Sequence, residues 1–247
     1  MQGHDTMTQS QGPARGSADR REVEKFDALA GRWWDRHGPM RPLHAMNPVR
    51  TAWIMQRVRL KFGVGGVQVL DVGCGAGLLA ESLTRAGCRV TGIDAAAEAI
   101  AAARAHASGQ GLTIDYRAAE TDDLVAEKSR FPVIAALEVI EHVPDPQGFL
   151  DTLATLLEPG GLLFVSTLNR TPQSYAMAKL GAEYLLRLLP AGTHDWQRFV
   201  TPGELAGMCR AAGLRLADVA GLVPAPLAGG FRESRHTAVN YIAMAQG

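Results

Sequence analysis

A glycine-rich turn at residues 73–77 carries the clearest chemical signal in this chain of 247 residues. Gly73, Gly75 and Gly77 follow the run 69–72, which predicts a buried strand, and they precede a helix predicted over residues 78–86. Glycine has no Cβ, so the backbone can adopt positive φ angles and a ligand can approach it closely. The N-terminus of the following helix offers unpaired N–H groups. The pattern therefore predicts a nucleotide-like ligand at this turn.

The spacing of the glycines narrows the choice of ligand. The dinucleotide fingerprint G-x-G-x-x-G would need glycine where this chain has Leu78, which disfavours NAD and FAD. No G-K-[ST] follows the glycines, as a Walker phosphate loop would require. A second predicted strand, 89–93, ends at Asp94, whose carboxylate could accept hydrogen bonds from two vicinal ribose hydroxyls. A ligand with ribose and adenine but no pyrophosphate fits best, and a glycine turn that only packs a helix on a sheet is the alternative.

The order of these features resembles the class I S-adenosylmethionine (AdoMet) methyltransferases. Their first motif has the form D-x-G-x-G-x-G, and here it begins at Asp71. The resemblance implies AdoMet as the methyl donor. Methyl transfer from a sulfonium needs an aligned acceptor and exclusion of water, and a phenolic acceptor must also lose a proton whose pKa is near 10.

A second chemical cluster follows the predicted strand 133–137. Glu138, Glu141 and His142 lie within five residues, at the end of a strand where ligands of parallel α/β sheets bind. Glu138 and His142 are four residues apart, so a helical turn would place them on one face. Such groups can act as general base or bind a divalent cation. The alternative is structural, with His142 only capping the helix that follows.

Further motifs match one family within this class. The chain has L-H-x-x-N-P-x-R at 43–50, G-A-E-Y at 181–184 and G-T-H-D at 192–195. Together with the motifs above they resemble the ubiquinone-biosynthesis O-methyltransferases, over about residues 22–244. The resemblance implies O-methylation of polyprenyl phenols, namely 2-polyprenyl-6-hydroxyphenol and 3-demethylubiquinol, and contact with other enzymes of ubiquinone biosynthesis.

Site residues follow from the same resemblance. It implies AdoMet contacts at Arg50, Gly73, Asp94 and Leu137, with Asp71 and Gly75 in the same motif, and Arg50 could pair with the methionine carboxylate. It also implies a divalent cation such as Mg²⁺ on Glu138, Glu141 and His142, of which Glu138 and His142 are the catalytic candidates. The chain departs from its relatives at Leu137, often methionine, and at Ala76, often glycine.

The elements that position these groups alternate between strand and helix, which predicts a parallel, doubly wound sheet. We expect an α/β, class I Rossmann-like fold with a mostly parallel seven-stranded sheet and helices on both faces. Residues 1–20 read as a disordered tail and 21–247 as the methyltransferase domain, with an apolar helical insertion at about 172–198. Residues 35–48 are expected to be irregular. The remaining expected helices are 49–62, 95–108, 146–157 and 202–212, and the remaining strands are 112–117, 162–167, 214–222 and 239–245.

The insertion contains an apolar segment, residues 173–189. Its charges Lys179, Glu183 and Arg187 form one stripe, and most of the remaining surface is apolar. Such a helix must be buried or face something apolar. We expect it to contact the membrane surface and admit the polyprenyl tail, and a lid packed on the protein's own core or at a dimer contact is the alternative.

Composition sets outer limits on function. Lysine plus arginine and aspartate plus glutamate balance at 25 each, so we expect no nucleic-acid partner. Three cysteines without a C-x-x-C pair, a polar N-terminus and the absence of a long apolar run predict a cytoplasmic protein, attached at most peripherally to the inner membrane. Two other functions stay open: methylation of a small soluble catechol, and a non-catalytic AdoMet-binding role in a biosynthetic complex.

Overall fold

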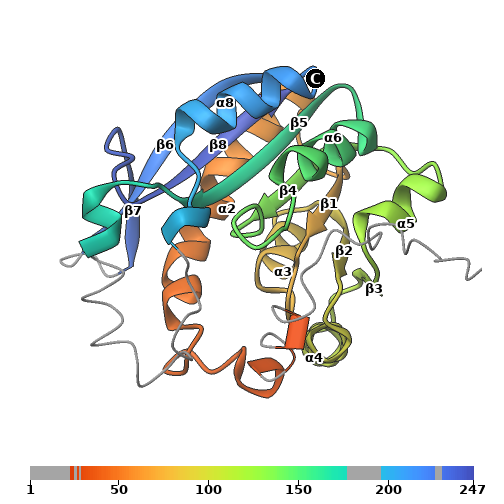
Figure 1. Cartoon of the computed structure of the whole chain (residues 1–247). Helices are drawn as coiled ribbons and strands as arrows, with labels where there is room; N and C mark the ends of the chain where they lie inside the picture. Colours follow the sequence, from red (N-terminus) through yellow and green to blue (C-terminus); the bar gives the residue numbers. More distant parts are fainter. Residues whose placement is uncertain (1–22, 25–26, 28, 177–195, 226–229) are drawn as a thin grey trace, which may run out of the picture.

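A single mixed sheet of eight strands, in the order β3-β2-β1-β4-β5-β8-β6-β7, organises the protein. The structure is a computed structural model that describes residues 23–24, 27, 29–176, 196–225 and 230–247. Figure 1 shows the twisted sheet crossing the molecule between helices on its two sides. The strands are β1 (Gln68–Val72), β2 (Arg89–Asp94), β3 (Asp115–Ala118), β4 (Phe131–Leu137), β5 (Leu157–Leu168), β6 (Arg215–Pro224), β7 (Phe231–Ser234) and β8 (Asn240–Gln246).

The pairing confirms a mostly parallel sheet. Strands β1 to β5 pair in parallel, whereas β8 pairs antiparallel with both β5 and β6. The predicted number of seven strands is wrong by one, because β7 adds an antiparallel edge strand to β6. Its sequence, Phe-Arg-Glu-Ser, has three polar residues out of four and so lacks an apolar pattern. Charged side chains are common on short edge strands, where they discourage pairing with other chains.

Helices cover both faces of the sheet, as predicted. Helices α2, α3 and α4 pack on one face, and α5, α6 and α8 on the other. Neighbouring strand residues alternate between the two cores: Val69 packs with the first group and Leu70 with the second. The helices are η1 (Ala30–Arg32), α2 (Arg41–Phe62), α3 (Leu78–Arg85), α4 (Ala97–Gly109), α5 (Thr121–Ala126), α6 (Pro146–Leu156), η2 (Trp196–Arg198) and α8 (Pro202–Ala211).

Helix α2 starts earlier than the sequence predicts. Residues 41–48 were expected to be irregular because of their prolines, yet the helix runs through Pro48. Proline removes one backbone hydrogen bond and usually kinks a helix. Here tertiary contacts hold the segment: Asn47 donates to the carbonyl of Leu78 and to the hydroxyl of Ser82. Packing therefore outweighs local preference, and it carries Arg50 within a continuous helix.

The segment after β3 forms α5, which begins at Thr121. Its N-cap Glu120 and Asp123 form a reciprocal capping box. Most of the apolar segment 173–189 lies outside the described residues. The described part before that gap ends with residues 172–176, which are helical. Within the described part of the chain, no helix is long and apolar enough to cross a bilayer.

Candidate active site

The glycine turn lies between β1 and α3, at the carboxyl end of the parallel strands. Gly73, Gly75 and Gly77 all have positive φ angles, of 66°, 52° and 89°. These conformations are strained for residues with a Cβ, which explains the three glycines. A Cβ at Gly75 would also overlap the ring of Trp33, and one at Gly77 would overlap the Tyr116 hydroxyl. The glycines therefore accommodate the protein's own aromatic side chains as well as a ligand, which the sequence did not reveal.

Asp94 ends β2 directly beside this turn. Its Oδ2 accepts a hydrogen bond from the Gly75 N–H at 2.8 Å, and its Oδ1 accepts one from the Ala96 N–H at 2.9 Å. Burial raises the pKa of Asp94, and these two N–H donors only partly offset that effect. Each oxygen keeps a lone pair for a further donor. The carboxylate is thus fixed in place and still able to accept hydrogen bonds from ribose hydroxyls.

Asp71, on β1 below the turn, is buried. Its Oδ2 has no hydrogen-bond partner among the described residues. Burial, with a smaller contribution from the charge of Asp94, raises the pKa of Asp71 to about 8. Without a ligand the group is therefore mostly neutral at pH 7. A cationic ligand nearby would favour its ionised form.

Glu138, the residue after β4, is held by three donors on one oxygen. Arg50 from α2 forms an ion pair with its Oε1, Ser166 from β5 donates to the same oxygen at 2.8 Å, and Asn240 from β8 donates at 3.2 Å. Glu138 has a backbone φ of 57°, which is unusual for a residue other than glycine. The side chain is 18% exposed, so its outer end reaches the surface of the site.

The contact of Arg50 with Glu138 differs from the contact expected from the sequence. The sequence placed it at the carboxylate of AdoMet, whereas in the ligand-free structure its guanidinium contacts Glu138. Its Nε is buried and has no partner among the described residues. The guanidinium therefore retains donor capacity for a second carboxylate. The sequence did not point to Ser166 or Asn240, because their approach to Glu138 depends on strand register that the sequence does not display.

Glu141 and His142 lie in the turn that follows. Glu141 is buried; its carboxylate lies close to the Thr167 side chain, but neither oxygen makes a well-formed hydrogen bond to a described residue. Burial and the neighbouring Glu138 carboxylate raise the pKa of Glu141. The His142 N–H closes the turn on the Val139 carbonyl at 2.9 Å. Because the segment is a turn and Glu138 has positive φ, Glu138 and His142 are not placed as neighbours on a helical face.

Leu137 closes β4 next to these groups. It is half-buried and pairs in register with Ser166 on β5. Most buried side-chain polar atoms that lack a partner in the described residues belong to this edge of the sheet. Buried polar groups are normally hydrogen-bonded, so their accumulation marks a place that a polar ligand completes. They are Arg50 Nε, Asp71 Oδ2, both oxygens of Glu141, Asn169 Oδ1 and Asn240 Oδ1.

Comparison with known proteins identifies the family. A family model described as a methyltransferase domain matches residues 41–219. The ubiquinone biosynthesis O-methyltransferase of Xanthomonas euvesicatoria pv. vesicatoria (strain 85-10) is 50% identical over 225 residues, covering 91% of this chain and 92% of that protein. Its counterpart in Xanthomonas oryzae pv. oryzae (strain PXO99A) is 48% identical over 240 residues, covering 97% and 99%. The chain belongs to the ubiquinone biosynthesis O-methyltransferase family.

Solved structures confirm the fold of this family member. Magnesium protoporphyrin IX methyltransferase from Synechocystis PCC 6803, solved with bound AdoMet, aligns with a TM-score of 0.61 and 17% identity over 94% of this chain and 99% of that one. A possible histamine N-methyltransferase from Thermotoga maritima aligns with a TM-score of 0.59 and 17% identity, over 91% and 99%. The fold of this chain is that of class I methyltransferases.

The residues present fit AdoMet better than they fit a metal ion. Asp94 offers fixed oxygens to a ribose, and the buried Asp71 suits a ligand that carries positive charge. By contrast, no three His, Cys, Asp or Glu side chains in the described residues are placed to hold one metal ion. In this arrangement Glu138, Glu141 and His142 do not form a ready metal centre. The metal requirement stays a prediction.

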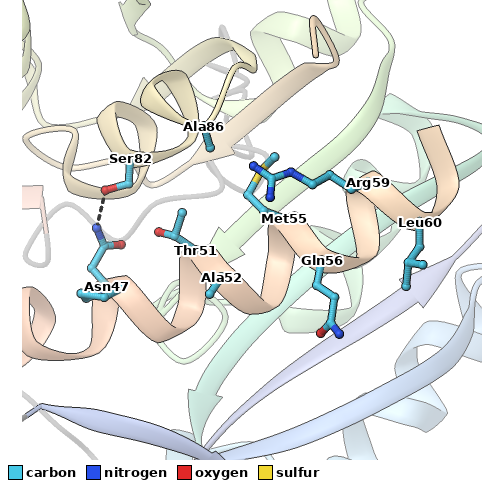
Figure 2. A pocket seen from close by; sticks show the side chains of 10 residues that line it. Asn47, Thr51, Ala52, Met55, Gln56, Arg59, Leu60, Ser82 and Ala86 are labelled. Atoms are coloured by element: carbon cyan, nitrogen blue, oxygen red, sulfur yellow. Dashed lines mark hydrogen bonds between the residues drawn. The ribbon is translucent and has the colours of Figure 1, made fainter. Parts of the chain in front are cut away.

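A separate groove of about 720 Å³ runs between α2 and α3 (Figure 2). Figure 2 shows Thr51, Met55 and Arg59 directed from α2 toward it, with Ser82 and Ala86 on the opposite side. None of the residues predicted for AdoMet or acceptor binding lines this groove. The site at the strand ends is therefore distinct from the groove.

Proposed function

We propose that this protein transfers the methyl group of AdoMet to a phenolic oxygen of a polyprenyl catechol or quinol in ubiquinone biosynthesis. The observation that carries the proposal is the 48–50% identity to ubiquinone biosynthesis O-methyltransferases over nearly the whole chain. The site is consistent with it, because carboxylates lie at the same edge of the sheet as the AdoMet-binding turn. The two substrates that we propose are 2-polyprenyl-6-hydroxyphenol and 3-demethylubiquinol.

On the cofactor side, AdoMet supplies an activated methyl group on its sulfonium. We assign Asp94 to the ribose hydroxyls, while Gly73 and Gly75 allow close approach of the backbone. Asp71 balances the positive charge of the ligand. Arg50, with its free Nε, holds the amino-acid carboxylate of the ligand while keeping contact with Glu138. Leu137 lines the adenine pocket as an apolar contact.

On the acceptor side, the phenol must lose its proton as its oxygen bonds to the methyl carbon, while the sulfur–methyl bond breaks and the thioether S-adenosylhomocysteine leaves. We assign the removal of this proton to Glu138. Three donors fix its Oε1, so Oε2 is the oxygen that can face the acceptor. His142, half-buried in the next turn, is the second candidate for the base. Both assignments are tested by the kinetics of the variants Glu138→Gln and His142→Ala.

The polyprenyl tail requires an apolar path to the site. We propose that residues 173–189 provide it and contact the membrane surface, with partner enzymes of ubiquinone biosynthesis nearby. Support comes from the composition of the segment, since most of it lies outside the described residues. In this proposal the enzyme is cytoplasmic and makes a peripheral contact with the inner membrane.

The deciding experiment measures methyl transfer from labelled AdoMet to a short-chain demethylubiquinol, with and without EDTA. Turnover supports the proposed function. Loss of turnover with EDTA and recovery with Mg²⁺ would assign Glu138, Glu141 and His142 to a cation, whereas unchanged turnover would leave Glu138 and His142 as acid–base groups. A protein that binds AdoMet and methylates soluble catechols but no quinol would contradict the proposed substrate.

A further inference from the structure

The segment that precedes α2 crosses the glycine turn and places Trp33 against it. Trp33 is only 6% exposed and packs with Met40 and Ala76 in a small apolar cluster. Its six-membered ring lies where a Cβ of Gly75 would otherwise stand. We call residues 29–40 the strap. Figure 1 shows its short η1 helix beside α4.

Two contacts fasten the strap to the core, one at Trp33 and one at Trp34. The Trp34 indole N–H donates to the carbonyl of Ala76, within the glycine turn, at 3.1 Å. His44 Nε2 lies 2.9 Å from the carbonyl oxygen of Trp33. These contacts join the strap to the turn and to α2, so the position of Trp33 is defined by directional bonds as well as by packing.

Trp34, the next residue, is held by His106, which itself contacts a buried glutamate. Its ring stacks on His106 of α4, with centroids 3.4 Å apart and an interplanar angle of 6°. His106 Nδ1 lies 2.6 Å from Glu81 Oε1, and Glu81 is fully buried in α3. Arg85 contacts the other oxygen of Glu81 at 2.9 Å. Because an unpaired buried carboxylate costs free energy, Glu81 keeps His106 in place. His106 in turn holds Trp34, and so the strap, by stacking.

The location of Trp33 relates it to the cofactor. The N–H of Gly75 bonds to Asp94, the carboxylate assigned to the ribose, and the ring of Trp33 covers the same glycine. Any ligand held by Asp94 and the turn must therefore meet this ring. Indole faces attract sulfonium and ammonium cations and stack on flat heterocycles. The strap also lies outside residues 41–219, the part that matches the methyltransferase family model.

We propose that Trp33 is an AdoMet-binding residue that forms the wall of the cofactor pocket above Gly75, and that Trp34 and His106 hold it there. The proposal rests on AdoMet as the methyl donor and is independent of the acceptor. Binding measured without any phenol therefore tests it separately from the proposed function.

The test is AdoMet binding by calorimetry and by tryptophan fluorescence. Trp33→Ala should raise the Kd for AdoMet about tenfold, the effect of losing one such aromatic contact. Trp33→Phe should bind nearly as well as the wild type yet lose most of the AdoMet-dependent fluorescence change. Trp53→Phe is the matched control, because Trp53 lies in the core against Phe164, and it should keep that change. Trp34→Phe, which removes the bond to Ala76 and keeps an aromatic ring next to His106, should weaken binding less than Trp33→Ala does.

Two results would overturn the proposal. An unchanged Kd for Trp33→Ala, with the fluorescence change retained in Trp33→Phe, would show that Trp33 only supports the fold. Tighter AdoMet binding by Trp33→Ala would show that the ring obstructs the pocket. Thermal unfolding of each variant identifies any that is misfolded, and Trp33→Phe keeps the fluorescence test valid if Trp33→Ala is unstable.

Discussion

At the scale of single residues, Glu138 shows how the site is built before any ligand binds. Its φ of 57° lies in a region that costs of order 1–3 kcal/mol for ordinary residues. Three donors from α2, β5 and β8 hold it there. Because all of them bind Oε1, the orientation of the carboxylate is set by residues distant in sequence. Preorganisation of this kind favours transfer of a proton in a fixed direction.

The first prediction concerns Asn240, a positioning residue for Glu138. Asn240→Ala should lower kcat about tenfold, because the loss of one hydrogen bond to a charged group is worth about 1.5–3 kcal/mol where it fixes a reacting group. The Kd for AdoMet should stay within about twofold, since Asn240 contacts Glu138 and not the turn. Gln246→Ala, at the exposed end of the same strand, is the control. Equal kcat values for both variants would remove Asn240 from the catalytic arrangement.

A second prediction follows from Asp71. Its pKa rises from 3.8 to about 8 on folding, so the folded chain binds more protons than the unfolded chain between these values. Stability without AdoMet should therefore fall as the pH rises from 6 to 8.5, by on the order of 1 kcal/mol per pH unit for this group. Unfolding in urea at several pH values measures the slope. Asp71→Asn should reduce the slope by this amount, while Glu141, whose pKa is also raised, keeps its own contribution. An unchanged slope would show that Asp71 does not bind this proton.

At the scale of elements, the sequence predicted best where one local pattern decides the outcome. The glycine turn, Asp94 and the helix beginning at Pro202 depend on short-range patterns, and in the structure a Thr201–Glu204 capping box starts that helix. Prediction from the sequence failed where tertiary contacts decide the structure, as at the start of α2 and at the edge strand β7. The roles of Trp33, Tyr116 and Asn240 were equally hidden, because their proximity to the site depends on packing between elements far apart in sequence.

The turn between β1 and α3 provides the third prediction. Gly77 has a φ of 89°, and an added Cβ would overlap the hydroxyl of Tyr116 from β3. Gly77→Ala should destabilise the fold by about 1–3 kcal/mol and weaken AdoMet binding. Gly109→Ala is a matched control, because that helical glycine has open space around its Cβ position. We expect it to be neutral or stabilising by up to about 1 kcal/mol, as for alanine over glycine in a helix. Similar unfolding free energies for the two variants would argue against this view of the turn.

At the scale of the whole molecule, the enzyme must combine a polar site with an acceptor whose tail is apolar. Charges balance at 25 each, so general electrostatic attraction to an anionic membrane is weak. No helix in the described ranges can span a bilayer. An apolar surface contact would bring the enzyme to a membrane-dissolved substrate, and the proposed contact segment, residues 173–189, has the composition for it.

The fourth prediction tests this contact with the double variant Leu185→Asp/Leu186→Asp. Two charges on the apolar face should abolish binding to phospholipid vesicles, because insertion depends on buried apolar area. Methylation of a long-chain acceptor in vesicles should fall at least about tenfold, while methylation of a short-chain acceptor in solution should persist. Leu60→Asp is the control, since Leu60 is an apolar residue of α2 that is already 81% exposed. If the double variant kept both vesicle binding and long-chain activity, residues 173–189 would instead be a lid over the protein's own core or a dimer contact. If both acceptors lost activity alike, the segment would be needed for the fold of the site.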